Sequence, residues 1–517
     1  MCSVAGAKTK QEVEKMLKIQ RHRSPDGINI EPAINSFATD KEPSFYIGMG
    51  RLSIIDLKSK NLCLYQDGYS LLSYNGEVYN YKELRKELII LGHKFETDSD
   101  TEVVFKSYVQ WGVECFNRFN GMFALALYDH STHSIILARD IVGQKPLFYR
   151  KKDFAFASEA KALITEDTKL ENDKFMDRMQ HIYEHTLYSD VWNLLPAHYV
   201  IYRLDFDRLE NPVKYWEYKY HYVNPKTALE ELEHLLKDAV ELVGRSDVKR
   251  ALYYSGGVDS SILDELGDFD ASYTIDPNSI TPEEFEKIIK DVVYHLDFPV
   301  GSLSSYPLYK LAKMANKDRI KVVISGEGAD EVFAGYIRYL PVANEYLMRS
   351  RYPSYTDLFS NIAQSYSHLF SSITNRHDNH DESRYLIEGA FKGFLEKNDP
   401  ITAMQLFDIQ YVLPSLLQMG DRMASAFGIE NRCPFLDKRV IEFGLSLPPE
   451  MKINNLETKV LLRQLIQRLS CRNYTEEKEK HGLTIPYNKW IGKKGYNRSH
   501  YFNLIKDVWK KQNSALS

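Results

Sequence analysis

Short apolar segments separated by tight turns fill much of residues 45–160. Two stretches only, residues 82–92 and 101–112, place apolar side chains at helical spacing. The pattern predicts layered antiparallel sheets with helices packed on them. The segments expected to form strands are FYIGMGRLSIID, SLLSYNGE, FALALYD, SIILARD, PLFYR and FAFASE.

The pattern changes after a helical stretch over residues 227–244. The apolar runs RALYY and IKVVI are each followed by a Gly/Ser turn and then by a helix-like run, SILDEL in one case and EVFAGYIRYL in the other. This order is typical of a parallel α/β sheet that binds its ligand at the carboxyl ends of the strands. The chain beyond about residue 340 reads as mostly helical, and we expect a domain boundary near residue 225.

The composition and charge of the chain exclude several classes of protein. The 517 residues are 44% hydrophobic and 26% charged, which is typical of globular domains and predicts two to four of them. A formal charge of -5 argues against wholesale binding to nucleic acid or an anionic membrane. No apolar run is long enough to span a membrane and no signal-peptide pattern opens the chain, so we expect a cytoplasmic protein. Five scattered cysteines without a CxxC pair indicate neither a disulfide framework nor a zinc site.

Cys2 is the cysteine whose position matters chemically. If the initiator methionine is removed, the α-amino group of Cys2 can take the proton of its own thiol and activate it as a nucleophile. Taken alone, Cys2 could equally be a chance residue near a chain end. The segments that follow favour a functional role for Cys2. In order along the chain they are RHRSPDG, GRLSIID, YNGEVYN, TDSDTEV and GMFALALYD.

With these five segments the chain resembles the glutaminase domain of class II, N-terminal nucleophile glutamine amidotransferases. The resemblance implies that Cys2 attacks the side-chain amide of glutamine. Arg51 would bind the substrate carboxylate as a planar fork, and Asp100 its ammonium group. Asn75 and Gly76, expected on a tight NG turn, would donate to the oxyanion, and Glu77 would be a further substrate-site residue.

The turn SGGVDSS offers a phosphate cradle, and no Walker-type motif occurs. Ser255, Gly256 and Gly257 let backbone N–H groups face an anion at a helix N-terminus, and Ser260 and Ser261 add hydroxyl donors. Asp259 suits a Mg²⁺ ligand facing ATP phosphates. The motif resembles the PP-loop of ATP pyrophosphatases.

The second turn, in SGEGADEVFAGY, gathers the carboxylates Glu327, Asp330 and Glu331. Such a group predicts bound cations or substrate amines, although acids at a helix N-terminus would explain one or two of them. With DRMASAFGIENRCPFLD, these motifs resemble the synthetase domain of glutamine-dependent asparagine synthetases.

The second resemblance implies roles for several residues. Glu327 would position or deprotonate ammonia, and Asp330 would join Asp259 on Mg²⁺. The residues expected around the nucleotide are Tyr253 and Ile275 at the adenosine, Ser325 and Gly326 beside it, and Lys459 at the phosphates. Lys145 and Glu159 are expected to be solvated or salt-bridged framework residues, and Arg422, Glu430 and Arg432 to hold the helical layer together.

One segment is shorter than the family pattern. After SYTID the family carries a further helix and strand, whereas this chain passes almost directly to TPEEFEKIIKDVVYHLDFPV. We expect a smaller sheet than in typical relatives, with ATP still bound at SGGVDSS and aspartate still accepted.

The expected fold is an α+β four-layer (αββα) N-terminal nucleophile domain over residues 2–220, followed by an α/β PP-loop domain over residues 225–517 with a parallel sheet and a largely helical C-terminal part. The expected reaction is glutamine-dependent asparagine synthesis with ATP as a substrate and Mg²⁺. The partners are small molecules, without nucleic acid or membrane; the oligomeric state stays open, a homodimer included. Three alternatives remain: an amidotransferase for another carboxylate (carbohydrate, peptide or secondary metabolite), a nucleic-acid-modifying PP-loop protein, and a non-catalytic relative.

Overall fold

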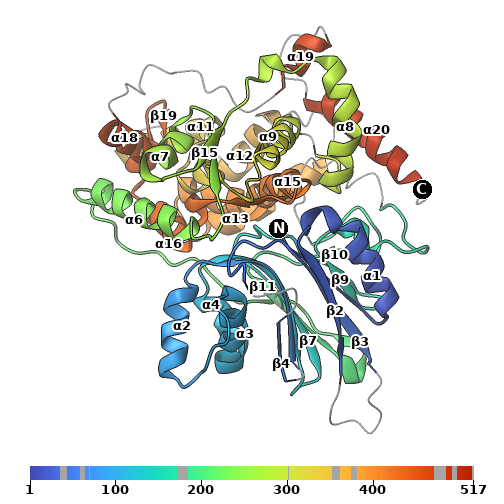
Figure 1. Ribbon diagram of the computed structural model, residues 1–517. Coiled ribbons are helices and arrows are strands. Elements are labelled where there is room, and N and C mark those ends of the chain that lie inside the picture. The colour runs from blue at the N-terminus through green and yellow to red at the C-terminus, as the bar shows by residue number, and fades with distance from the viewer. Residues whose placement is uncertain are drawn as a thin grey trace.

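The computed structural model describes ten stretches of the chain. Two halves are stacked in Figure 1, with the blue and teal elements below and the yellow to red helices above. The N-terminus lies between the halves. The described stretches are residues 1–34, 43–58, 65–68, 70–171, 184–300, 302–351, 361–373, 381–470, 485–491 and 498–514.

Two antiparallel sheets form the lower half. The first has the strand order β10-β8-β9-β1-β3-β2, and the second β12-β11-β7-β6-β5-β4 with β13 paired to β11. The strands of the first are β1 (Ser3–Ala7), β2 (Gly27–Ala33), β3 (Phe45–Arg51), β8 (Phe148–Arg150), β9 (Ala155–Ala157) and β10 (Val191–Asn193). Those of the second are β4 (Tyr65–Asp67), β5 (Ser70–Val78), β6 (Gly121–Asp129), β7 (Ser134–Arg139), β11 (His198–Arg203), β12 (Arg208–Leu209) and β13 (Val213–Lys214).

Strand β6 is buried on both faces. Successive side chains of a strand point to opposite faces. Ala124 and Ala126 join an apolar cluster with Val4 and Phe45 of the first sheet, while Phe123 and Leu125 join a different cluster. Because both faces of β6 are buried, its sequence is a nearly continuous apolar run rather than an alternating one.

Helices flank the two sheets. Helix α1 (Lys10–Ile19) packs against β1, β2 and β3, and α3 (Asp100–Trp111) packs against β5 and against α2 (Tyr81–Ile90). Ser99 caps α3 by accepting a hydrogen bond from the backbone N–H of Thr101. The remaining short helices of this half are α4 (Cys115–Arg118), η1 (Arg21–Arg23), η2 (Gly112–Glu114), η3 (Ala160–Leu163) and η4 (Leu204–Phe206).

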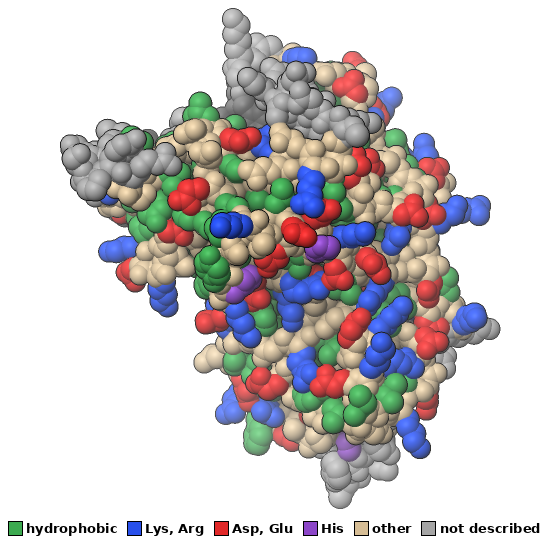
Figure 2. Space-filling view, turned by 90° about the vertical axis from the view of Figure 1, so that its left-hand side faces the viewer, with side chains coloured by type: hydrophobic (Ala, Val, Ile, Leu, Met, Phe, Trp, Pro, Cys, Tyr) green, Lys and Arg blue, Asp and Glu red, His purple; other side chains and the backbone are tan. Residues whose placement is uncertain are grey.

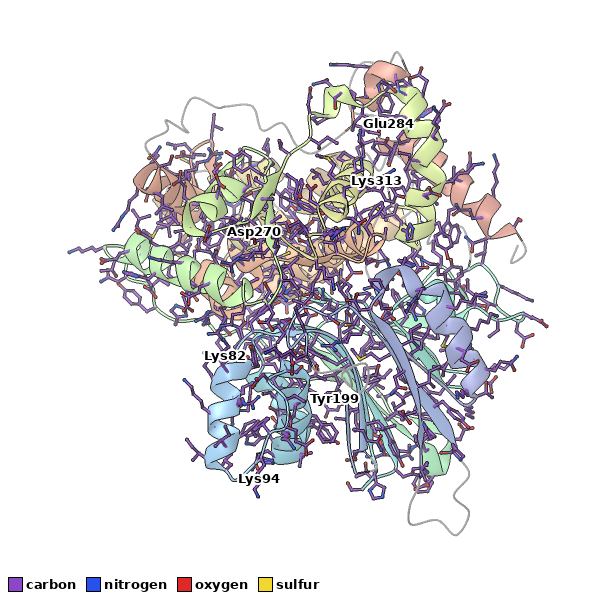
Figure 3. The ribbon with its side chains drawn as sticks, viewed as in Figure 1. Lys82, Lys94, Tyr199, Asp270, Glu284 and Lys313 are labelled. Atoms are coloured by element: carbon purple, nitrogen blue, oxygen red, sulfur yellow. The ribbon has the colours of Figure 1, made fainter. Side chains whose placement is uncertain are left out.

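A four-stranded sheet in the order β15-β14-β16-β17 lies in the upper half, and every neighbouring pair in it is parallel. This confirms the predicted parallel sheet in a mixed α/β architecture. Asp270, labelled in Figure 3, accepts a hydrogen bond from the backbone N–H of Arg250 at 2.9 Å, where β14 begins. The strands are β14 (Arg250–Tyr253), β15 (Ala271–Tyr273), β16 (Val322–Ile324) and β17 (Glu430–Arg432).

Helices surround this sheet. The α-helices are α6 (Ala228–Val243), α7 (Val258–Leu266), α8 (Pro282–Leu296), α9 (Ser305–Lys317), α10 (Ala329–Val332), α11 (Leu340–Arg351), α12 (Ile362–Ile373), α13 (Asp381–Leu395), α14 (Pro400–Phe407), α15 (Leu413–Ser425), α16 (Lys438–Ser446), α17 (Pro449–Lys452), α18 (Val460–Leu469), α19 (Tyr487–Trp490) and α20 (Arg498–Gln512). The other elements are η5 (Pro277–Ser279), η6 (Ile337–Tyr339), the π-helix η7 (Asp408–Val412), η8 (Pro434–Leu436), and the strand pair β18 (Ile453–Asn454) and β19 (Glu457–Thr458).

The helix expected after SGEGAD is wrong in length. Helix α10 has four residues and ends before Ala334, whose φ is +53°. A left-handed residue cannot continue a right-handed helix, so the chain turns there before η6.

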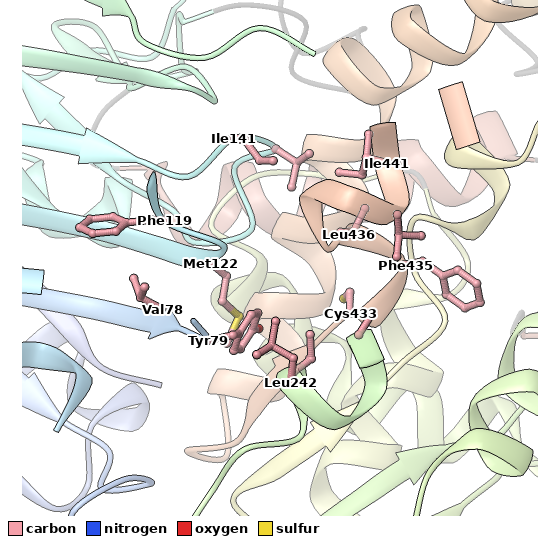
Figure 4. Close-up of a cluster of buried hydrophobic side chains, with 14 of the residues drawn as sticks. Val78, Tyr79, Phe119, Met122, Ile141, Leu242, Cys433, Phe435, Leu436 and Ile441 are labelled. Atoms are coloured by element: carbon pink, nitrogen blue, oxygen red, sulfur yellow. The ribbon is translucent and has the colours of Figure 1, made fainter. Parts of the chain in front are cut away.

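The two halves share an apolar cluster at their interface (Figure 4). Val78, Tyr79 and Met122 from the lower half belong to the same buried cluster as Leu242 and Phe435 from the upper half. The relative position of the halves is therefore fixed by a continuous core.

The surface mixes charges of both signs. In Figure 2 the Lys and Arg side chains are interspersed with Asp and Glu over the visible face. Within the described stretches, none of the helices combines the length and the apolar character needed to cross a membrane.

Candidate active sites

A pocket beside the N-terminal cysteine brings together five residues that the sequence predicted separately. Its lining includes Cys2, Arg51, Gly76, Glu77 and Asp100. They come from the chain end, from β3, from β5 and from the start of α3, so the fold and not the sequence spacing assembles the pocket.

The structure shows the Cys2 thiol in a chain that still carries Met1. The backbone N–H of Leu52 lies 3.4 Å from Sγ of Cys2, and burial raises the pKa of the thiol to about 11. Met1 is fully buried, with Nζ of Lys145 at 2.9 Å and Nη2 of Arg23 at 3.7 Å from its sulfur. Burial also lowers the pKa of the Met1 amino group to about 5. The Met1 amino group is therefore mostly neutral near pH 7.

Asn75 and Gly76 correct the sequence prediction, because they do not lie on a turn. Both are inside β5, where Asn75 pairs with Ala124 and Gly76 with Phe123. A Cβ on Gly76 would lie 2.1 Å from the carbonyl oxygen of Met122, so close strand packing explains the glycine. Neither side-chain amide atom of buried Asn75 has a hydrogen-bond partner in the described part of the chain. Such an atom is available to a ligand.

The acidic side of the pocket is built around Asp100. Tyr74 Oη donates to its carboxylate at 2.8 Å and the Val78 N–H donates to the same oxygen at 3.2 Å. Burial raises the pKa of Asp100 to about 6. Burial and the neighbouring Asp100 also raise the pKa of Glu77. A bound ammonium group would favour the ionised form of both carboxyl groups.

The guanidinium group of Arg51 is oriented by the loop after β3. Its Nη2 donates to the carbonyl oxygens of Ile55 at 3.2 Å and Asp56 at 2.9 Å. These two hydrogen bonds fix the positive charge of Arg51 at the pocket wall, where it can bind a carboxylate group of a ligand.

The predicted phosphate cradle is the turn between β14 and α7. Gly256 has a φ of +76°, which a residue with a side chain rarely adopts, and Gly257 is the N-cap of α7. Ser260 Oγ lies 3.2 Å from the Ser255 N–H and 3.1 Å from Ser255 Oγ, which closes the turn. Ser261 is buried, and its hydroxyl lies 3.4 Å from that of Tyr254, the residue directly before the turn.

Lys459 bridges the two predicted metal ligands. Its Nζ lies 2.6 Å from a carboxylate oxygen of Asp259 and 2.6 Å from one of Asp330. A Cβ on Gly335 would lie 2.1 Å from Asp330 and 2.2 Å from Lys459, so glycine makes room for the bridge. Two carboxylates that share one cation fit Mg²⁺, which is commonly held by one or two carboxylates together with substrate phosphates. No group of three or more His, Cys, Asp or Glu side chains suited to a metal occurs among the described residues.

Glu327 lies beside this cradle, in the loop between β16 and α10. Asn431 Nδ2 donates to its carboxylate at 2.9 Å, and burial raises the pKa of Glu327 to about 7. Ser325 and Gly326 precede it, and a Cβ on Gly326 would lie 3.0 Å from Cβ of Asp259. The second turn therefore packs directly on the first.

Three other predicted residues make no hydrogen bond to the groups described above, among the described residues. Tyr253 is buried in an apolar cluster and its hydroxyl has no hydrogen-bond partner within the described residues, while Ile275 packs against the same cluster. Glu331 accepts a hydrogen bond from Tyr336, which gives this third acid a structural contact.

The structure corrects the roles expected of Arg422, Glu430 and Arg432. Glu430 and Arg432 are in strand β17, not in a helical layer, and Arg432 Nη2 lies 2.9 Å from the Glu77 carboxylate. Glu430 lines the Cys2 pocket and lies 3.6 Å from Nζ of Lys145. Arg422 lies on α15 but pairs with Glu159 of the lower half. The three residues of β17 are all polar, so no apolar alternation in the sequence marks this strand.

Comparison with known proteins gives matches over both halves. The family described as a glutamine amidotransferase domain matches residues 1–216, and the family described as asparagine synthase matches residues 278–514. Asparagine synthetase (glutamine-hydrolysing) 1 of Bacillus subtilis is 28% identical over 544 residues, covering 93% of this chain and 84% of that protein. A Methanocaldococcus jannaschii protein, which carries the same name provisionally, is 32% identical over 390 residues, covering 64% of this chain and 73% of that protein.

These matches agree with the geometry, because the first covers Cys2, Arg51 and Asp100 of the thiol pocket and the second covers the Glu327 turn and Lys459. The chain belongs to the family of glutamine-hydrolysing asparagine synthetases.

Proposed function

We propose that the protein makes asparagine from aspartate, with ammonia from glutamine and energy from ATP. The observation that carries the proposal is the presence of two complementary sites in one chain, a thiol pocket and a phosphate cradle, on either side of a shared core. Linking them is useful because free ammonia would be protonated and lost in solvent.

In the first site, the Cys2 thiolate attacks the side-chain amide carbon of glutamine. Asn75 and the Gly76 N–H donate to the oxyanion, ammonia leaves, and water then releases glutamate from the γ-glutamyl thioester. Arg51 binds the substrate carboxylate, and Asp100 with Glu77 binds its ammonium group. The unpartnered amide of Asn75 and the convergence of the pocket residues support these roles.

In the second site, the β-carboxylate of aspartate attacks the α-phosphorus of ATP and pyrophosphate leaves. Ammonia then attacks the acyl-adenylate, so that asparagine and AMP form and one proton is released. Glu327 positions ammonia or accepts that proton. Mg²⁺ held by Asp259 and Asp330 would neutralise phosphate charge, as would Lys459.

The remaining nucleotide contacts are assigned by the same proposal. Ser255, Gly256, Gly257 and Ser260 cradle the pyrophosphate, with Ser325 and Gly326 beside the nucleotide and Tyr253 and Ile275 at the adenosine. We further infer an αββα N-terminal nucleophile domain over residues 2–220 and a synthetase domain with a helical C-terminal part over residues 225–517.

The test is one incubation with glutamine, ATP and Mg²⁺, with and without aspartate, in which glutamate, pyrophosphate, AMP and asparagine are measured. The proposal expects pyrophosphate and asparagine in equal amounts, and only when aspartate is present. Glutamate release without any aspartate-dependent pyrophosphate would contradict it.

A different carboxylate acceptor is the second candidate. The sheet ends at β15, after which η5 and α8 follow directly, so the region where the family pattern has an additional helix and strand differs in this chain. Pyrophosphate release driven by another carboxylate, with aspartate inactive, would favour this alternative.

A further inference from the structure

Strand β17 lies between the two sites and presents a different side chain to each. Successive side chains of a strand point to opposite faces, so Glu430 and Arg432 share one face of β17 and Asn431 occupies the other. Arg432 Nη2 lies 2.9 Å from the Glu77 carboxylate, and Asn431 Nδ2 lies 2.9 Å from the Glu327 carboxylate. One three-residue strand therefore contacts an acid in each reaction centre.

On the first face, the fully buried guanidinium of Arg432 is fixed by several acceptors. Besides Glu77, it donates to Glu430 at 2.9 Å and to the carbonyl oxygens of Val243 and Arg245 at 2.9 and 2.6 Å. Because the guanidinium group is planar and bonded to all of these acceptors, its orientation is fixed. The fixed guanidinium group in turn orients the Glu77 carboxylate in the Cys2 pocket.

On the second face, the Glu327 carboxylate is enclosed by β17 and α15. The Cys433 thiol lies 3.7 Å from the oxygen that Asn431 contacts, and a Cβ on Gly420 of α15 would lie 2.8 Å from the other oxygen. The Asn431 amide must direct its nitrogen to the carboxylate, because its own oxygen there would repel it. That oxygen has no hydrogen-bond partner among the described residues.

Strand β17 is itself anchored. It pairs with β16 along its whole length, from Val322 opposite Glu430 to Ile324 opposite Arg432. Cys433, directly after the strand, belongs to the apolar cluster that joins the halves (Figure 4). A shift of β17 would thus move contacts in both sites together.

We propose that β17 positions one acid in each reaction centre: Arg432 orients Glu77 in the glutamine pocket, and Asn431 orients Glu327 at the ammonia step. The inference rests on the proposed function. Asn431 and Arg432 are positioning residues, because each acts through the carboxylate that it contacts.

Asn431→Leu tests the Glu327 face, since it removes the donor at similar volume. With ammonium chloride as nitrogen source, kcat for asparagine should fall about tenfold or more, because displaced catalytic groups commonly cost this much. The KM values for aspartate and ATP, and glutamine hydrolysis, should stay as in wild type. Asn344→Leu is the matched control, since its amide joins Leu340 to Asn455 outside both sites, and it should leave all rates unchanged.

A pH profile separates positioning from general loss of structure. The charged or titratable groups facing Glu327 are Asp421 from α15, Cys433 directly after β17 and Tyr253 from β14. The hydrogen bond from Asn431 favours the ionised carboxylate, so Asn431→Leu should move the acid limb of ammonium-driven synthesis to higher pH. Wild-type kcat and an unmoved limb in this variant would overturn the proposal for this face.

Arg432→Lys tests the Glu77 face, because an ammonium group keeps the charge and loses the planar fork. We expect the KM for glutamine to rise about tenfold, with ammonium-driven synthesis unchanged. If this variant does not fold, Glu77→Asp, which withdraws the carboxylate from Arg432, should give the same result. An unchanged glutamine KM would overturn this half.

The wild-type reaction distinguishes a failure of the proposed function from a failure of the role proposed for β17. If wild-type protein makes no asparagine from aspartate, the proposed function is wrong. If it does, and Asn431→Leu matches it, only the role of β17 is wrong.

Discussion

At the scale of single residues, the state of Cys2 depends on Met1. A thiol with a pKa of about 11 is almost wholly protonated at pH 7 and is a poor nucleophile. The Met1 sulfur lies 2.9 Å from Nζ of Lys145. Removal of Met1 would free the α-amino group of Cys2 to act as a base for its own thiol. The unprocessed chain should therefore be a latent glutaminase.

The first prediction follows from that contact. Protein that retains Met1 should show no glutaminase activity, and treatment with a methionine aminopeptidase should restore it in proportion to the processed fraction measured by mass spectrometry. Active protein with Met1 still attached would contradict this account.

The second prediction concerns the thiol itself. Cys2→Ala should lower glutamine hydrolysis by at least about 10³-fold and leave synthesis from ammonium chloride intact, because only the first site needs the thiolate. Glutamate release and asparagine formation are measured separately. Cys115→Ala, at a buried free thiol outside both sites, is the control and should keep both activities.

The third prediction uses the raised pKa of Glu327, which is about 7. A carboxyl group accepts a proton only when it is ionised, so activity should be lost as pH falls through 7. At constant free ammonia, synthesis at pH 6 should be roughly a tenth of its value on the alkaline plateau. Glu327→Gln should be slow and lack this limb; an identical limb in that variant would assign it to another group.

At the scale of elements, two glycines allow chain segments to approach within contact distance. Gly76 lets β5 and β6 pack, and Gly335 lets Asp330 reach Lys459. Gly76 is required by Met122 on the neighbouring strand. Gly335 is required both by distant Lys459 and by Asp330, to whose carbonyl oxygen its own N–H donates at 2.7 Å.

The fourth prediction is that Gly335→Ala impairs adenylation selectively. The added Cβ would lie 2.1 Å from the Asp330 carboxylate and should displace it from Lys459. Aspartate-dependent pyrophosphate release should fall about tenfold or more, with glutamine hydrolysis unchanged. Gly389→Ala, on α13, is the control because nothing lies within 4 Å of its added Cβ.

Sequence patterns predict elements well where apolar side chains form an unbroken run or recur at helical spacing. The apolar run at β6 and the helical spacing at α3 are both confirmed as elements. The turn assigned to Asn75 and Gly76 is wrong, because an NG pair has the same local preference in a hairpin as in a strand that needs a glycine for close packing. The pairing of Arg432 with Glu77 joins residues 355 positions apart, which no local pattern contains.

At the scale of the whole molecule, a buried ion cluster joins the two halves. Arg23 lies 2.8 Å from Asp421, and Arg422 lies 3.2 Å from both Glu159 and Asp297. Burial opposes ionisation of Glu159, yet the surrounding Lys161, His22 and Arg422 outweigh it and lower its pKa. Removing one charge leaves the others buried without compensation.

The fifth prediction is that Arg422→Met lowers the free energy of unfolding by roughly 3–5 kcal/mol, as measured in urea. Lys8→Met is the control, because its pair with Asp207 is exposed and should contribute less than about 1 kcal/mol. Equal effects of the two substitutions would mean that the cluster does not stabilise the interface.

The most direct test of the whole account follows the nitrogen atom. The protein is given glutamine labelled with ¹⁵N in its side-chain amide, together with aspartate, ATP, Mg²⁺ and unlabelled ammonium. The account predicts that the label appears in the amide of asparagine, with one pyrophosphate per asparagine formed. Labelled ammonia in solution without labelled asparagine, or pyrophosphate release that does not depend on aspartate, would contradict it.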